Sequence, residues 1–162
     1  MPSPIGQSPP PLLCRPLRAD EVDEACALAR TVFDRCVAPD QPEEGRRMFH
    51  AFAQPAALLR RHRKRYATWV AVAGPEIVGV LHIHAANHLS LLFVAPEHHG
   101  RGCARALLRA AAEAHALVPP LTVNASPGSV SFYARLGFAA TGPARFKDGV
   151  HHQPMRGERP LF

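Results

Sequence analysis

A helical period governs the first third of the chain. Apolar side chains recur there at spacings of three and four, as one face of an amphipathic helix requires. They are Val22, Ala25, Ala29, Val32 and Cys36. We expect Asp20 to cap this helix and the helix to stop before Pro39. A second helical region follows Pro42 and continues to about Arg65, and Pro55, which lacks a backbone donor, divides it.

From Tyr66 onward the apolar pattern is typical of strands. Residues 68–73 and 77–83, joined by a Gly-Pro turn, predict a β-hairpin. The apolar runs 89–94 and 121–124 predict two more strands, and 12–17 predicts a short edge strand. Two last stretches, 138–141 and about 150–155, can close the sheet.

Two further helices lie between these strands. The first begins at Cys103, carries an apolar stripe as far as Leu117 and is expected to end at Pro119-Pro120. The second runs from about Gly128 to Arg135 and stops at Gly137, which suits the left-handed position after a helix. Helices and strands therefore intermix, as in an α/β domain.

Length and composition indicate one globular domain. A chain of 162 residues with 47% apolar and 20% charged residues supports a single core and is not typical of a disordered chain. Residues 1–11 are rich in proline and lack periodicity, so we expect a disordered tail before a domain at 12–162. Four cysteines without CxxC spacing favour reduced packing residues. The chain shows neither a ~20-residue apolar run nor a secretory leader, so we expect a cytoplasmic protein without a membrane partner.

The net charge of +6 favours an anionic partner. The dense basic run at 60–65 raises the possibility of a nucleic-acid-binding module. No zinc-finger spacing or RNA-binding aromatic motif accompanies the run, and cations at the end of a helix complement its dipole. We therefore do not expect nucleic acid as the partner, and this module stays an alternative.

A glycine-rich loop carries the first chemical signal. The segment from His99 to Gly102 leaves a predicted strand and enters a predicted helix. Glycines let the backbone approach a ligand closely, and free N–H groups at a helix start form a cradle for an anion such as pyrophosphate. The loop lacks the Gly-Lys-Ser/Thr sequence of a P-loop and the third small residue of a dinucleotide fingerprint. Neither an ATPase nor a nicotinamide-dependent dehydrogenase is supported.

Three motifs together resemble those of the GNAT superfamily of N-acetyltransferases. They are Val94-Ala95-Pro96, the loop His99-Gly100-Arg101-Gly102-Cys103-Ala104, and Phe132-Tyr133-Ala134-Arg135-Leu136-Gly137-Phe138. The resemblance implies a central mixed, mostly antiparallel sheet of about seven strands, flanked by about four helices and splayed between the fourth and fifth strands. It also implies acetyl-CoA held in that splay as cosubstrate. His82 and His84 alternate on one strand face, as a metal pair could, but no Cys or carboxylate ligand lies near them in the sequence, so we expect no metal.

The resemblance implies a set of cosubstrate contacts along the strand, the loop and the last short helix. They are Leu92, Phe93, Val94, His99, Gly100, Arg101, Gly102, Cys103, Ala104, Arg105, Asn124, Ser126, Phe132 and Tyr133. Two positions depart from the family pattern. His99 stands where the family has Arg or Gln, and Ser126 stands where many members have Asn. We favour Asn124 for the pantetheine arm because its amide both donates and accepts.

Acyl transfer to an amine needs a neutral nucleophile, a polarised carbonyl and a protonated leaving sulfur. An amine with a pKa near 10.4 is neutral in only about one molecule in 10³ at neutral pH, so a proton acceptor is expected. Tyr133 is the candidate general acid, and a backbone N–H near Val94 is the oxyanion donor that the resemblance implies. His84, His88 and Ser90 are candidate bases, and a water relay without a dedicated base is an equal alternative.

The implied function is transfer of an acetyl group from acetyl-CoA to a primary amine of a small molecule or peptide, by direct attack in a ternary complex. Asp34, Asp40, Glu43 and Glu44 form an acidic group that either receives a cationic amine or consists of ordinary solvated helix ends. A GNAT-fold protein that binds acetyl-CoA without catalysis is a further alternative. A homodimer, common in the family, is compatible with the chain.

Overall fold

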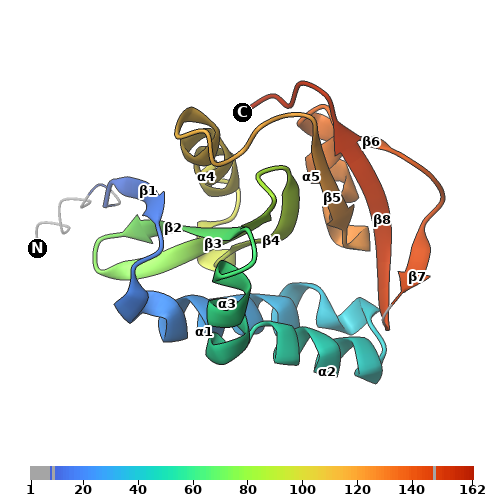
Figure 1. Cartoon of the computed structure of the whole chain (residues 1–162), viewed down its shortest axis with the longest axis horizontal. Coiled ribbons are helices and arrows are strands. Elements are labelled where there is room, and N and C mark those ends of the chain that lie inside the picture. The colour runs from blue at the N-terminus through green and yellow to red at the C-terminus, as the bar shows by residue number, and fades with distance from the viewer. Residues whose placement is uncertain (1–7, 9, 148) are drawn as a thin grey trace, which may run out of the picture.

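The computed structural model describes residue 8, residues 10–147 and residues 149–162. Most of the predicted tail, residues 1–7 and 9, lies outside this range. Within it, eight strands form one sheet in the order β1-β2-β3-β4-β5-β8-β6, and β7 pairs with β8 (Figure 1). The strands are β1 (Leu12–Pro16), β2 (Tyr66–Ala73), β3 (Glu76–His84), β4 (His88–Val94), β5 (Leu121–Ala125), β6 (Ala139–Ala140), β7 (Arg145–Lys147) and β8 (Val150–Gly157).

Five α-helices flank the sheet. They are α1 (Val22–Cys36), α2 (Glu43–Phe52), α3 (Pro55–His62), α4 (Cys103–Glu113) and α5 (Val130–Arg135). Figure 1 shows α1, α2 and α3 on one side of the sheet and α4 on the other. The predicted fold class, a mixed and mostly antiparallel sheet with helices on both faces, is confirmed. The described residues contain eight strands and five α-helices, where the resemblance implied about seven and about four. The additional strand is β7, which gave no periodic signal, and the additional helix comes from the division at Pro55 that the sequence predicts.

Strands β4 and β5 pair in parallel over only two residue pairs, His88 with Thr122 and Leu89 with Val123. Strand β4 continues for five further residues, while β5 pairs with β8 along its other edge. A register shift against β3 leaves Ser90 as an extra residue between Leu89 and Leu91, which is a β-bulge. Bulges bend a strand, so β4 turns away from β5 beyond this point and the sheet is splayed there.

The core fills both faces of the sheet. Alternate residues of β2 face opposite sides, with Trp69 and Ala71 in the larger cluster beneath α4 and α5, and Val70 in a smaller cluster against α1. Leu107 and Leu121 are fully buried in the larger cluster. This packing fixes α4 and α5 against the splayed region.

Two helix ends differ in how well the sequence predicted them. Gly137 has a φ of 88°, and the N–H of Phe138 bonds to the Tyr133 carbonyl, as expected for a left-handed end to α5. The prediction that α4 ends at Pro119-Pro120 is wrong. His115 adopts a φ of 59° and the Ala116 N–H bonds to the Ala111 carbonyl, so the helix closes after Glu113.

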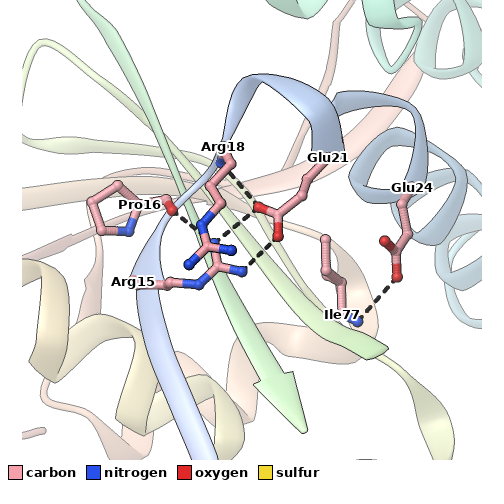
Figure 2. Close-up of polar contacts among 6 residues, drawn as sticks. All are labelled: Arg15, Pro16, Arg18, Glu21, Glu24 and Ile77. Atoms are coloured by element: carbon pink, nitrogen blue, oxygen red, sulfur yellow. Dashed lines mark hydrogen bonds and ion pairs between the residues drawn. The ribbon is translucent and has the colours of Figure 1, made fainter. Parts of the chain in front are cut away.

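The start of α1 also differs from the prediction, because Asp20 lies in a 3₁₀ turn, Ala19–Glu21, and Glu21 occupies the position before the helix. Figure 2 shows that the Arg15 guanidinium from β1 holds both oxygens of Glu21, at 2.9 and 2.5 Å. The Arg18 backbone N–H donates to the same carboxylate. The Arg15 guanidinium lowers the pKa of Glu21 to about 2. This pair ties the edge strand to the first helix.

A buried chain of hydrogen bonds joins α3 to the sheet. Arg61 Nε donates to Nε2 of His82 at 3.1 Å, so the ring proton of His82 is on Nδ1 and points to Thr68 Oγ1 at 2.7 Å. The Thr68 hydroxyl can then donate to His62 Nε2 at 2.6 Å. His82 is fully buried, and burial followed by the Arg61 charge lowers its pKa to about 3. Two members of the basic run 60–65 therefore have structural contacts inside the fold.

Because His82 is buried in its neutral form, we expect the free energy of unfolding to fall as the pH is lowered. Its pKa in the folded state lies below the value of about 6.5 in an unfolded chain, so the unfolded state alone takes up a proton as pH falls through 6.5. His62 and His88, whose pKa values burial also lowers, act with the same sign. We expect the free energy of unfolding in urea to drop by about 1 to 2 kcal/mol between about pH 7 and pH 5. A free energy that stays level or rises over this range would contradict a neutral buried imidazole.

Candidate active site

Two cavities meet where β4 and β5 part. The loop cavity, of about 650 Å³, lies between the end of β4, the loop before α4, and α5. The aromatic cavity, of about 340 Å³, lies between α1, α2, β4, β5 and the start of β8. Both are lined by a common set of residues, Val37, Leu92, Phe93, Ser126, Ser129 and Tyr133. A molecule in one cavity is therefore in reach of a molecule in the other.

The glycine loop has the backbone geometry that the sequence predicts. Gly100 and Gly102 have φ values of 73° and 76°, and Gly102 is the residue that precedes α4. A Cβ built on either glycine meets no atom within 4 Å, so the backbone here faces open space. The N–H groups of the first turn, at Cys103, Ala104 and Arg105, have no acceptor within the helix. The loop is thus an open cradle of donors.

Charge and a side-chain bond favour an anion in this cradle. Arg105 and Arg135 line the loop cavity, and among its described lining residues there is no Asp or Glu. His99 Nε2 donates to the Val94 carbonyl at 2.7 Å, which fastens the loop to the end of β4. His99 therefore acts on the loop's position through this bond. Burial raises the pKa of the Cys103 thiol to about 11, so this residue packs as a neutral side chain.

Tyr133 stands at the junction of the two cavities. Its side chain is 5% exposed and packs edge to face against Phe132 and Phe138. Burial raises its pKa far above the ordinary value for a phenol, so the hydroxyl stays protonated at neutral pH. Among the described residues no group bonds to this hydroxyl, yet it is not one of the sealed-off polar atoms, so it opens into the cavity. A protonated, unengaged hydroxyl is available to a ligand there.

The candidate bases divide by position. Ser90, at the bulge of β4, lines the aromatic cavity. His84 and His88 pair with each other across β3 and β4 at the closed end of the splay, and neither is a lining residue of either cavity. His88 bonds to Thr122 Oγ1 at 2.8 Å, and the His84 ring stacks on Tyr66.

The two candidates for the pantetheine arm also occupy different places. Asn124 lines the aromatic cavity, whereas Ser126 lines both cavities. Ser129 Oγ donates to the Ser126 carbonyl, so the Ser126 hydroxyl bonds to Ser129 Oγ at 2.9 Å. Of the other expected contacts, Leu92 and Phe93 line both cavities, and Val94, His99, Gly100, Gly102, Cys103, Ala104, Arg105 and Phe132 line the loop cavity. Arg101 is exposed and lines neither.

The sequence analysis missed most of the aromatic cavity. Its wall includes Phe33, Met48, Phe49 and Phe52 from α1 and α2, and its other end includes Val150, His151 and His152 from β8. These residues come from segments far apart in the sequence, so no spacing relates them. Two adjacent histidines, His151 and His152, lie within the last predicted strand and were a visible signal. This signal was weak because the chain contains ten histidines.

One buried amide holds the β8 end of this cavity in place. Gln41, which is 5% exposed, accepts the His151 N–H at 2.7 Å and donates to the His151 carbonyl at 3.1 Å. The bonds hold β8 against the segment that leads into α2. Gln41 is a lining residue of neither cavity. It is therefore a positioning residue for the aromatic cavity.

We expect Gln41→Ala to lower the free energy of unfolding by about 1 to 3 kcal/mol, because the two hydrogen bonds between the buried amide and the His151 backbone are lost. For the reaction that the resemblance implies, the KM for an amine acceptor should rise, while the Kd for acetyl-CoA should stay the same. Urea unfolding, steady-state kinetics and calorimetry measure the three quantities. The matched control is Gln54→Ala, since Gln54 is exposed and makes one bond to the His50 carbonyl. Equal effects of the two variants would refute the positioning role.

The fold is that of known N-acetyltransferases. A GCN5-related N-acetyltransferase from Rhodopseudomonas palustris superposes with a TM-score of 0.73 at 20% identity, over 96% of this chain and 99% of that one. The PaiA N-acetyltransferase from Thermoplasma acidophilum, solved in complex with coenzyme A, gives 0.72 at 18% identity, over 91% and 99%. A spermidine N-acetyltransferase SpeG chimera from Vibrio cholerae and hSSAT gives 0.60 at 16% identity, over 91% and 95%.

The sequence defines the family. Residues 37–159 match the sequence model described as an acetyltransferase (GNAT) domain, which is more than half of the chain. The chain therefore belongs to the GNAT acetyltransferase family, and the predicted resemblance is confirmed. No curated protein sequence matches it. Within the described residues, no helix is both long and apolar enough to cross a membrane.

Proposed function

We propose that the chain transfers the acetyl group of acetyl-CoA to a primary amine by direct attack in a ternary complex. The observation that carries the proposal is the pair of cavities that meet at Tyr133, one beside an open cradle of backbone donors and one walled by aromatic rings. Two substrates bound on the two sides would place their reacting atoms at this junction.

The loop cavity fits the pyrophosphate and pantetheine of acetyl-CoA. Positive φ values at Gly100 and Gly102 leave the backbone open where a Cβ would fill the cradle, and Arg105 and Arg135 add positive charge. Helix N-terminal N–H groups bind phosphate regardless of the side chain at position 99. Past Leu89, the edge of β4 that faces β5 has no strand partner in the part of the chain that the structure describes, so an extended arm can bond to it.

A backbone donor for the thioester carbonyl lies on the same edge. Successive N–H groups of a strand point to opposite edges, and the Ala95 N–H bonds to Val78 on β3. The Val94 N–H therefore points into the splay. A fixed donor of this kind stabilises the negative charge that develops on the carbonyl oxygen.

Proton transfers complete the reaction. The amine nitrogen attacks the carbonyl carbon, the carbon–sulfur bond breaks, and the sulfur takes the proton of the Tyr133 hydroxyl. The nitrogen releases its proton to water, and the water returns a proton to the tyrosine oxygen. Burial raises the pKa of the Tyr133 phenol, which makes it a weaker acid, but the same apolar surroundings disfavour a charged thiolate, so the leaving sulfur also needs a proton. We keep Ser90 as the group that orients this water, since it lines the aromatic cavity.

Binding and turnover test the proposal separately. Acetyl-CoA should raise the melting temperature and bind one molecule per chain in calorimetry. Thiol release should then require both acetyl-CoA and an amine. Acetyl-CoA binding without turnover of any amine would favour a binding protein instead. Salt-sensitive binding to random DNA without acetyl-CoA affinity would favour a nucleic-acid module.

A further inference from the structure

The aromatic cavity has an uneven chemistry. Rings from α1 and α2, those of Phe33, Phe49 and Phe52, line only this cavity, whereas the hydroxyls of Ser126, Ser129 and Tyr133 lie at the end shared with the loop cavity. A bound molecule would place a polar group at the junction and an apolar body against the helices. The polar group at the junction is the one that reacts.

The rings form a wall and do not form a cage for a cation. Phe33 and Phe49 stack face to face with centroids 3.9 Å apart and an interplanar angle of 6°, so each covers a face of the other. Phe93 meets Phe49 edge to face at 5.6 Å. Recognition of a cation by aromatic rings needs free ring faces that converge on it. Here Phe33 and Phe49 each use one face against the other, and the Arg61 guanidinium already covers a face of Phe52.

Charge around the cavity opposes a cationic acceptor. Among the described lining residues there is no Asp or Glu. The Arg61 guanidinium covers the Phe52 ring at 3.6 Å, and its NH2 group is buried without a hydrogen-bond partner among the described residues. Asp34, one of the acidic residues considered for binding a cationic amine, is paired with His50 at 2.6 Å. Asp40, Glu43 and Glu44 are not lining residues either. Asp148 lies outside the described residues.

We propose that the acceptor is an arylalkylamine, an aromatic body with a short arm that ends in a primary amine, and that it reacts as the uncharged amine. This inference rests on the proposed function. The cavity is lined by aromatic and aliphatic side chains and by neutral polar groups such as Ser90 and Asn124, with His151 and His152 at the β8 end and no carboxylate among its described lining residues. Such a site penalises the ammonium form and so lowers the pKa of a bound amine. The cavity thereby favours the neutral nucleophile without a dedicated base. A polyamine would keep a second charge with no partner.

The test compares 2-phenylethylamine, n-butylamine and 1,4-diaminobutane as acceptors for the full chain. We expect kcat/KM for 2-phenylethylamine to exceed that for n-butylamine about 10- to 100-fold, from burial of the ring. 1,4-Diaminobutane should be the poorest of the three. Saturation-transfer NMR in the presence of coenzyme A reads binding of the same amines without turnover, and should give the same order.

A designed carboxylate sharpens the test. Met48 lines the cavity and is 44% exposed, so Met48→Glu adds a negative charge at its edge without filling the core. We expect this variant to raise kcat/KM for 1,4-diaminobutane about 2- to 5-fold and to lower that for 2-phenylethylamine. The matched control is Leu59→Glu, since Leu59 is 48% exposed on α3 and lines neither cavity. This control should leave both values unchanged.

The outcomes separate the two proposals. Equal kcat/KM for 2-phenylethylamine and n-butylamine, or preference for 1,4-diaminobutane, would overturn the acceptor class and leave the acetyltransferase reaction standing. If that preference disappeared in Asp148→Asn, a carboxylate from outside the described residues would be its source, and the inference would be wrong. Absence of acetyl-CoA binding together with absence of turnover would overturn both.

Discussion

Replacing Tyr133 with phenylalanine is expected to lower kcat about 100-fold, because a positioned general acid typically contributes at least that factor. The Kd for acetyl-CoA should change less than about twofold, since the ring and its packing against Phe132 and Phe138 remain. Stopped thiol-release assays at saturating amine measure kcat, and calorimetry measures the Kd. The chain offers a matched control, because its only other tyrosine, Tyr66, stacks on His82 and His84 away from both cavities. Tyr66→Phe should leave kcat unchanged.

The pH profile gives an independent check on this role. Burial raises the pKa of Tyr133, so its hydroxyl stays protonated well above neutral pH. The wild-type kcat should therefore not fall as pH approaches about 10, where an ordinary tyrosine ionises. An unchanged kcat in Tyr133→Phe would remove the residue from the chemistry, and its packing role alone would remain.

Replacing Gly102 with alanine is expected to raise the Kd for acetyl-CoA by at least about tenfold. The added Cβ would stand in the open cradle, where a phosphate oxygen must approach the backbone. The left-handed backbone also strains any other residue, by about 1 to 2 kcal/mol. Calorimetric titration with acetyl-CoA gives the Kd, and urea unfolding gives the cost in stability.

A second glycine serves as a control that separates the effect of an added Cβ on acetyl-CoA binding from the effect of backbone strain on stability. Gly74 has a φ of 60° in the β2–β3 turn and is a lining residue of neither cavity. Gly74→Ala should lower the free energy of unfolding by a similar amount and leave the acetyl-CoA Kd unaffected. If both variants bind acetyl-CoA like the wild type, the cradle between Gly100 and Ala104 is not the phosphate site.

Local signals in the sequence predicted the fold well. Continuous apolar runs on either side of a Gly-Pro turn defined β2 and β3 to within two residues, and Gly137 fixed the end of α5. The end of α4 was missed because His115 adopts a conformation usually left to glycine. The three-residue strand β7 is too short for any periodicity, and it exists because β8 lies beside it.

The sequence likewise indicated some parts of the candidate site and missed others. The glycine loop and Tyr133 belong to contiguous motifs, so the sequence indicated them. The aromatic cavity forms only when α1, α2 and the start of β8 come together, and Gln41 reaches His151 across more than a hundred residues. The basic run could not be interpreted from composition, because Arg61 and His62 make internal hydrogen bonds to His82 and Thr68.

The most direct test of the central claim follows both products of one reaction. Acetyl-CoA and 2-phenylethylamine are incubated with the wild-type chain, free coenzyme A is measured by its thiol, and N-acetylated amine is measured by mass spectrometry. The account predicts equal amounts of the two products, both strongly reduced in Tyr133→Phe. Coenzyme A release without acetylated amine, or equal product from wild type and variant, would contradict acyl transfer to an amine at the junction of the two cavities.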